Sequence, residues 1–147
     1  MRIHAQGSSH ACQISRLRFV HFARRSCASG PSLKERPVLL PVLEQGKGRI
    51  VFYRTQIVGG AYQPDVLVNG QKVGSATRRG VFFRDFAPGK YAVTTTMTKD
   101  VVTLDLANGD KKYIKLSYSF GFQIYPELVD ATKGEAEALQ LTFAGKK

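Results

Sequence analysis

Turn-forming residues recur at short intervals between apolar runs along residues 48–145, and this spacing is the feature that most limits the fold. Asn69-Gly70 is the strongest of these signals, because a type I′ hairpin turn needs positive φ at both central residues. The spacing predicts short strands joined by tight turns rather than long helices. Further turns or bends are expected at Gly74, Pro88, Gly89 and Gly109.

The apolar residues between these turns follow the two-residue period of strands. Residues 91–97, 102–106 and 114–118 alternate apolar and polar side chains, which is typical of half-buried strands. Residues 49–54 are mainly apolar toward both faces, so we expect this strand to be central in its sheet.

One helix is predicted, over residues 132–139, where Thr132 can cap the start and Glu135 can complete a capping box. We expect it to be too short to cover a sheet. Because each strand has one apolar face to bury, two sheets must face each other. The sequence therefore predicts an all-β fold, an antiparallel β-sandwich of about seven to eight short strands with one short C-terminal helix.

The first third of the chain differs from the rest in charge. Residues 1–45 hold 7 basic and 2 acidic residues, and residues 46–147 hold 15 and 9. We predict a basic segment over residues 1–26 that is disordered or not native, a proline-containing tether over 27–47, and a domain over 48–145. A mitochondrial-type presequence is an alternative for the first segment, which is rich in arginine and free of acids.

The residues around Cys27 resemble the start of a mature bacterial lipoprotein, in which a cysteine carries the lipid and leads into a Ser/Gly/Pro-rich tether. Ser26 fits the small residue before that cysteine, but Arg24 and Arg25 do not fit the apolar signal. Our hypothesis is that residues 1–26 come from a wrong start or a shifted reading frame, and that the true precursor has an apolar signal ending at Cys27. The alternative is that Cys27 is an ordinary exposed thiol.

Residues with reactive or metal-binding side chains are unevenly distributed. All 3 His and both of the 2 Cys lie within the first 27 residues, so the predicted domain lacks the usual nucleophile–base pairs and the nitrogen and sulfur ligands of zinc. Its aspartates are scattered singly, where they are expected to form turns rather than a hydrolytic carboxylate pair. We therefore predict no catalytic residues, no cofactor and no metal site. Five of these aspartates lie among the predicted turns and strands, and they are Asp65, Asp85, Asp100, Asp105 and Asp110.

The net charge of +11 raises the question of an anionic partner. Four cations close in sequence could form an anion-binding patch for phosphate head groups or other envelope polyanions, although a solvated loop is the favoured alternative. Nucleic acid is a less favoured partner, because no recognition motif accompanies the charge. The four cations are Arg78, Arg79, Arg84 and Lys90.

An aromatic cluster surrounds Gly121. We expect it to belong to the core, and a surface groove for a partner is the alternative. Its members are Tyr118, Phe120, Phe122 and Tyr125.

Three motifs in order carry a resemblance to a known family. Residues 48–54 (GRIVFYR), 68–74 (VNGQKVG) and 86–91 (FAPGKY) resemble an uncharacterised family of small bacterial lipoproteins and secreted proteins, with a GRIYFYR start, an NGxxVG hairpin and a PGxY turn. The middle portion is also similar to PEGA-type surface modules. The resemblance implies a β-sandwich, an envelope location and no known catalytic residues.

Together these observations predict a non-enzymatic domain of the cell envelope. It is predicted to act either as a binding module for an unknown ligand or as a structural spacer. We expect it on the periplasmic side of a bacterial membrane, held there by a lipid on Cys27 in the true precursor, with envelope proteins or polyanions as partners. The alternative function is a soluble basic protein that binds nucleic acid or anionic surfaces.

Overall fold

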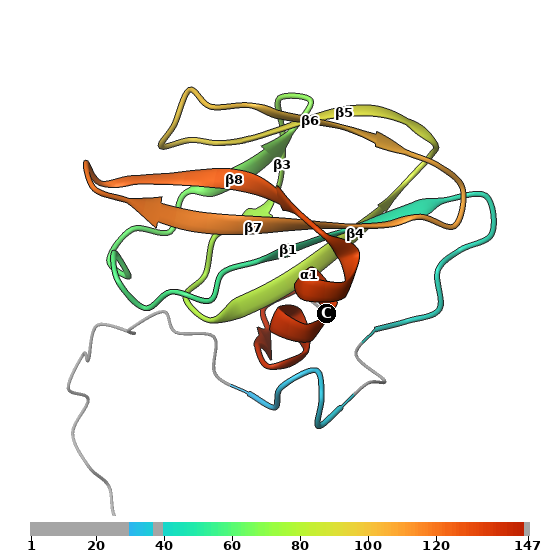
Figure 1. Ribbon diagram of the computed structural model, residues 1–147, viewed down its shortest axis with the longest axis horizontal. Coiled ribbons are helices and arrows are strands. Elements are labelled where there is room, and N and C mark those ends of the chain that lie inside the picture. The colour runs from blue at the N-terminus through green and yellow to red at the C-terminus, as the bar shows by residue number, and fades with distance from the viewer. Residues whose placement is uncertain (1–29, 37–39, 146–147) are drawn as a thin grey trace, which may run out of the picture.

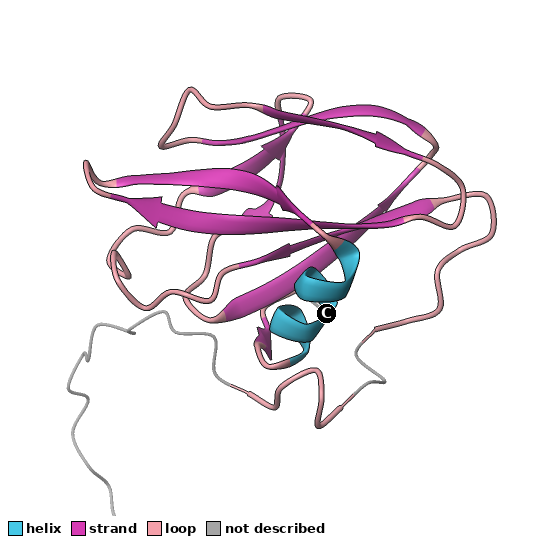
Figure 2. Cartoon of the chain, viewed as in Figure 1, coloured by secondary structure: helices cyan, strands magenta, loops and turns pink. Residues whose placement is uncertain are grey.

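The computed structural model describes residues 30–36 and 40–145, which form two β-sheets packed face to face with one helix on an outer face (Figure 1; Figure 2). This confirms the predicted all-β sandwich. The described residues hold nine strands, one more than expected, because the last strand is only two residues long. The elements are β1 (Gly48–Tyr53), β2 (Asp65–Val68), β3 (Gln71–Ser75), β4 (Gly80–Phe86), β5 (Gly89–Thr95), β6 (Val102–Leu106), β7 (Lys111–Ser119), β8 (Gln123–Val129), α1 (Ala131–Leu139) and β9 (Thr142–Phe143).

The first sheet has the order β8-β7-β1-β4-β9, and the second has the order β3-β2-β5-β6. β1 pairs antiparallel with β4 but parallel with β7, where Val51 lies opposite Tyr113. β4 and β9 are also parallel. These two pairings depart from the predicted antiparallel arrangement, because alternation shows which face of a strand is buried and not the direction of its neighbour.

The main core lies between the two sheets. β1 contributes Ile50 and Phe52, both fully buried, and the ring of Phe52 stacks on that of Phe82 with centroids 5.0 Å apart. The second sheet supplies the opposite layer. Its buried members in this core are Val66, Val68, Val93, Leu104 and Leu106.

A second, smaller core covers the outer face of the first sheet. Val51 and Tyr53 alternate with Ile50 and Phe52 along β1 and pack outward, against Ala138 of α1 and other apolar side chains. Every residue of β1 is buried as a result, which confirms the prediction that this strand is central.

The helix covers only part of this outer face, in keeping with the expectation that it is too short to cover a sheet. Gly134 lies so close to β7 that a Cβ there would stand 2.4 Å from the Cβ of Tyr113. The N-cap of the helix differs from the predicted residue, Thr132. Asp130 is the N-cap, and its Oδ2 accepts from the backbone N–H of Thr132 at 3.0 Å, because the chain leaves β8 at Val129 and enters the helix directly.

Residues 30–36 and 40–47, within the segment predicted as a tether, lie against the domain. Leu33 is 1% exposed in the outer core, and the backbone N–H groups of Leu33 and Lys34 donate to the carbonyls of Leu141 and Leu139. We call residues 30–36 and 40–47 the arm. The predictions for Cys27 and for residues 1–26 fall outside the described residues.

Candidate functional site

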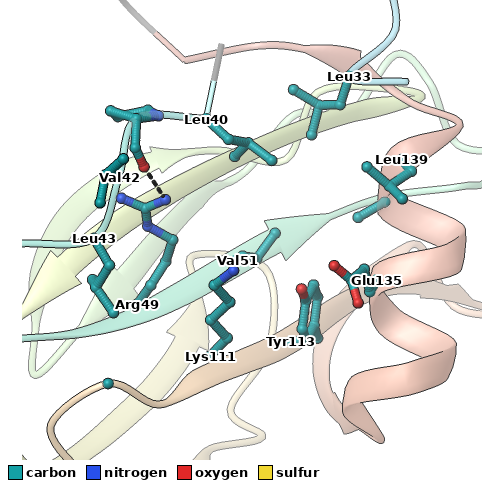
Figure 3. Close-up of a pocket in the computed structure, with 13 residues that line it drawn as sticks. Leu33, Leu40, Val42, Leu43, Arg49, Val51, Lys111, Tyr113, Glu135 and Leu139 are labelled. Carbon is teal, nitrogen blue, oxygen red and sulfur yellow. Dashed lines mark hydrogen bonds between the residues drawn. The ribbon is translucent and has the colours of Figure 1, made fainter. Parts of the chain in front are cut away.

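A pocket of about 480 Å³ lies on the outer face of the first sheet, between β1, β7, α1 and the arm (Figure 3). Its floor comes from the two parallel strands, and its opposite walls come from the helix and the arm. We call it the outer pocket. Its apolar lining includes Leu33, Leu40, Leu43, Val51, Ala138 and Leu139.

Arg49 forms one end of the outer pocket and joins three parts of the fold. Its side chain is 4% exposed, and its Nε and Nη2 donate to the two carboxylate oxygens of Asp85 at 2.6 and 2.8 Å. Its Nη1 donates to the carbonyl of Pro41 at 2.7 Å, the contact dashed in Figure 3. The guanidinium also lies 4.2 Å from the ring centroid of Phe83. Arg49 is therefore neutralised by Asp85 and holds the arm on the sheet.

Three other polar side chains line the same pocket. Lys111 and Tyr113 rise from β7 on one face, and Glu135 faces them from α1 (Figure 3). Burial raises the pKa of the Tyr113 hydroxyl, with a smaller contribution from the negative charge of Glu135. Within residues 30–36 and 40–145, the structure shows no ion pair for Lys111. The ammonium of Lys111 and the hydroxyl of Tyr113 are thus available to a polar group in the pocket.

A second polar cluster lies beside the pocket, under α1. The Tyr53 hydroxyl donates to Glu137 Oε2 at 2.7 Å, and Lys115 Nζ donates to both Glu137 oxygens at 3.2 and 3.1 Å. Burial raises the pKa of Glu137, but the hydrogen bonds from Tyr53 and Lys115 outweigh it and the net pKa is lowered. Burial and the hydrogen bond to Glu137 raise the pKa of Tyr53. A charged carboxylate therefore links the helix to two strands.

Comparison with known protein families assigns part of this chain to a family. A family model described as a protein of unknown function, DUF2846, matches residues 44–127. This chain belongs to the DUF2846 family. The matched segment begins before β1 and ends within β8, so it includes the pocket floor and excludes α1 and most of the arm.

Two other comparisons do not extend this family assignment. None of the curated proteins matches the chain. A solved structure, the N-terminal domain of AlgF from P. aeruginosa, is similar to it with 21% sequence identity and a TM-score of 0.41, over 58% of this chain and 94% of that one. The predicted likeness to lipoproteins and to PEGA-type modules stays a prediction.

The four cations predicted as an anion-binding patch are spread along the molecule. Arg78 and Arg79 precede β4, and Lys90 lies in β5 beyond the far end of β4, a strand that spans about 20 Å. Arg84 lies between them, with its guanidinium 5.8 Å from the ring centroid of Phe82. Lys90 is 80% exposed and lies 4.0 Å from Asp105. The structure thus brings Arg78 and Arg79 together and separates them from Lys90, and anion binding stays a prediction.

The expected turn residues lie in three different settings. Asn69, Gly70 and Gly109 have positive φ values of 49°, 80° and 80°, as tight turns require. Pro88 precedes Gly89, the first residue of β5, where the chain passes from the first sheet to the second. Gly74, where a bend was expected, pairs with Val66 next to a register shift between β2 and β3. It lies inside β3, where a Cβ would stand 2.5 Å from the Phe82 ring.

Within residues 30–36 and 40–145, no group of three or more His, Cys, Asp or Glu could hold a metal ion. Since His4, His10, His21, Cys12 and Cys27 all lie outside the described residues, the prediction of no metal site remains a prediction. No helix in the described part of the chain is long and apolar enough to cross a membrane.

Sequence reasoning missed the outer pocket. Its floor residues alternate along β1 and β7 like ordinary strand residues, and the parallel pairing that places Val51 beside Tyr113 leaves no signal in either strand. One signal was available. Tyr113 and Ile114 are adjacent apolar residues, which indicates that both faces of β7 are covered.

Proposed function

We propose that this chain is a non-enzymatic binding module of the bacterial cell envelope and that the outer pocket is its binding site. The observation that carries the proposal is the pocket itself. About 480 Å³ of space has mainly apolar walls and a few convergent polar groups, which is the usual character of a small-molecule site.

The chemistry of the walls indicates the class of ligand. The leucines of the arm and of α1 form walls suited to an apolar chain or ring. Lys111 and Tyr113 offer a cation and a hydroxyl to one acidic group of the ligand. Glu135 stands across the same opening and disfavours a ligand that carries several negative charges. An elongated amphiphile with a single carboxylate satisfies all three conditions.

A titration with dodecanoate, followed by calorimetry, tests the binding site. Leu43→Trp places a large ring in the pocket and should abolish binding, whereas Leu128→Trp, on the exposed edge strand β8, should leave it unchanged. Lys111→Ala should weaken binding about tenfold, since a hydrogen bond to a charged group is lost. Equal binding by wild type and Leu43→Trp, or no binding by wild type, would refute this assignment.

The envelope location rests on separate support, the Ser/Gly/Pro-rich sequence that follows Cys27. A thioether-linked lipid on this cysteine, together with an amide-linked chain, gives stable attachment because each buried methylene contributes about 0.8 kcal/mol. Palmitate labelling of the product of the natural locus should mark the wild type and not Cys27→Ser. Absence of label from the wild type would contradict the lipid anchor and leave the pocket to be judged by its own titration.

A further inference from the structure

Exposed apolar side chains gather at one end of the sandwich. Of the eight large hydrophobic side chains that are exposed among the described residues, six lie in three loops that Figure 1 shows together at the left of the view. These loops follow β1, connect β5 to β6, and connect β7 to β8. We call these three loops the loop end. The six side chains are Ile57, Val58, Tyr62, Val101, Phe120 and Phe122.

The β7–β8 connection is the most prominent part of the loop end. Phe120 is fully exposed and Phe122 is 61% exposed, so the expectation that these two aromatics belong to the core was wrong, whereas Tyr118 does pack against it. Phe122 has a φ of 64°, a left-handed conformation that is a costly outlier for a bulky residue. An aromatic side chain is thus held outward by the fold at a position that favours glycine.

A buried arginine holds the loop after β1 in place through hydrogen bonds to its backbone. Arg54 is completely buried, and its guanidinium donates to the carbonyls of Val58 at 2.8 Å, Tyr62 at 2.9 Å and Ala76 at 3.0 Å. Tyr62 then meets Phe122 edge to face, with ring centroids 5.9 Å apart. These contacts join two loops into one apolar surface that is presented in a fixed conformation.

Positive charge surrounds this surface. Arg54 has no acidic partner among the described residues, and Arg78 lies next to Gly60 of the same loop. Arg79 and Lys99 are exposed in neighbouring connections. Two acids lie nearby, Asp65, which pairs with Lys72 at 2.8 Å, and Asp100. Arg78, Arg79 and Lys99, the three cations here that are not fully buried, outnumber these two acids.

We propose that the loop end docks on the surface of an anionic lipid bilayer, with Phe120 and Val58 entering the interface. The apolar side chains stand on convex loop tips, which a fluid lipid surface accommodates, whereas a protein partner needs a close-packed complementary face. The surrounding cations match the negative potential of such a bilayer. This surface is separate from the outer pocket and does not depend on the ligand proposed there.

Tryptophan fluorescence offers a direct test, because the chain contains no tryptophan. Phe120→Trp places a single reporter at the tip, and Leu128→Trp places one at an exposed apolar position of β8. With vesicles of mixed phosphatidylglycerol and phosphatidylcholine, the emission of Phe120→Trp should shift to shorter wavelength and be quenched by brominated lipid. Leu128→Trp should show neither effect, even if another basic segment brings the full chain to the vesicle.

A flotation assay gives an independent readout with the same vesicles. Phe120→Ser should lower the partition coefficient by about tenfold to a hundredfold, since the apolar burial of one aromatic side chain is lost. Leu128→Ser should have no effect, and Phe120 is too exposed for its replacement to unfold the domain. Lys99→Glu should weaken flotation on anionic vesicles and not on vesicles of phosphatidylcholine alone.

Three outcomes would overturn the proposal. The first is unshifted Phe120→Trp emission on vesicles that demonstrably carry the protein. The second is an equal loss of flotation in Phe120→Ser and Leu128→Ser. The third is an emission shift that follows protein concentration without lipid, which would assign the loop end to contact between two copies of this chain.

Discussion

Arg49 carries a positive charge into the wall of the outer pocket, and its neutralisation by Asp85 is the main electrostatic feature of that wall. The sequence shows an arginine at the start of a strand and an aspartate 36 residues later, and nothing in either motif connects them. The pairing becomes visible only when β1 and β4 are placed in register, Arg49 opposite Asp85.

Asp85→Asn should therefore destabilise the domain by about 3 to 5 kcal/mol, because a buried guanidinium loses its counter-ion. The matched control is Asp105→Asn, whose carboxylate is 80% exposed and lies 4.0 Å from Lys90. That change should alter the free energy of unfolding by about 0.5 kcal/mol or less. Urea denaturation of both variants measures the difference, and equal effects would argue against a structural role for the Arg49 pair.

A second prediction concerns Gly134, where two physical effects on stability oppose each other. In an exposed helix, glycine to alanine stabilises by up to about 1 kcal/mol, but here the new Cβ meets Tyr113 at 2.4 Å. Gly134→Ala should destabilise by about 1 to 3 kcal/mol, because the helix must move away from the sheet. Ala136→Gly, at an exposed position of α1, isolates the propensity effect. Stabilisation by Gly134→Ala would show that helix and sheet are not closely packed.

The helix α1 and the arm are the elements that turn an ordinary sheet face into a pocket. The sequence predicts the strands well, since alternation and turn residues are local properties, and it predicts the helix to within one residue at its start. It fails on the helix cap and on strand direction. Asp130 lies just outside the helical pattern, and the parallel β1–β7 pairing depends on contacts distant in sequence.

The contacts of Glu137 with Tyr53 and Lys115, which join α1 to the sheet, should depend on pH. The pKa of Glu137 in the folded state is below its ordinary value of 4.5, so its contribution to stability is complete above pH 4.5 and is lost as the pH falls through the folded pKa. Glu137→Gln should cost about 1.5 to 3 kcal/mol near neutral pH. Thermal unfolding of both proteins across this range should show the gap closing below pH 4.5. A gap that stays constant would mean that Glu137 is not held in its charged form.

The arm is predicted to be part of the folded unit through Leu33. Leu33→Ala removes a side chain that is 1% exposed and should destabilise by about 2 to 5 kcal/mol. Leu128→Ala, at 46% exposure, should cost about 1 kcal/mol or less. Denaturant midpoints compare the two, and equal small effects would identify residues 30–36 as an undocked segment.

At the scale of the whole molecule, the two surfaces proposed for binding do not overlap. The outer pocket lies against α1 and the arm, while the apolar loop end lies at the tips of three strand connections (Figure 1). Sequence reasoning missed the outer pocket, and it singled out Phe120 and Phe122 but favoured the core for them. A pocket depends on how elements pack together, and the exposure of Phe120 depends on where a hairpin ends relative to the core.

The measurement that tests this account most directly is a map of amide chemical shifts during titration with dodecanoate. The account predicts changes in β7 around Lys111 and Tyr113, in α1 around Ala138 and Leu139, and in the arm around Leu43, with the loop end unaffected. Changes confined to residues 120–122 and the loop after β1, or changes absent from α1 and the arm, would contradict it.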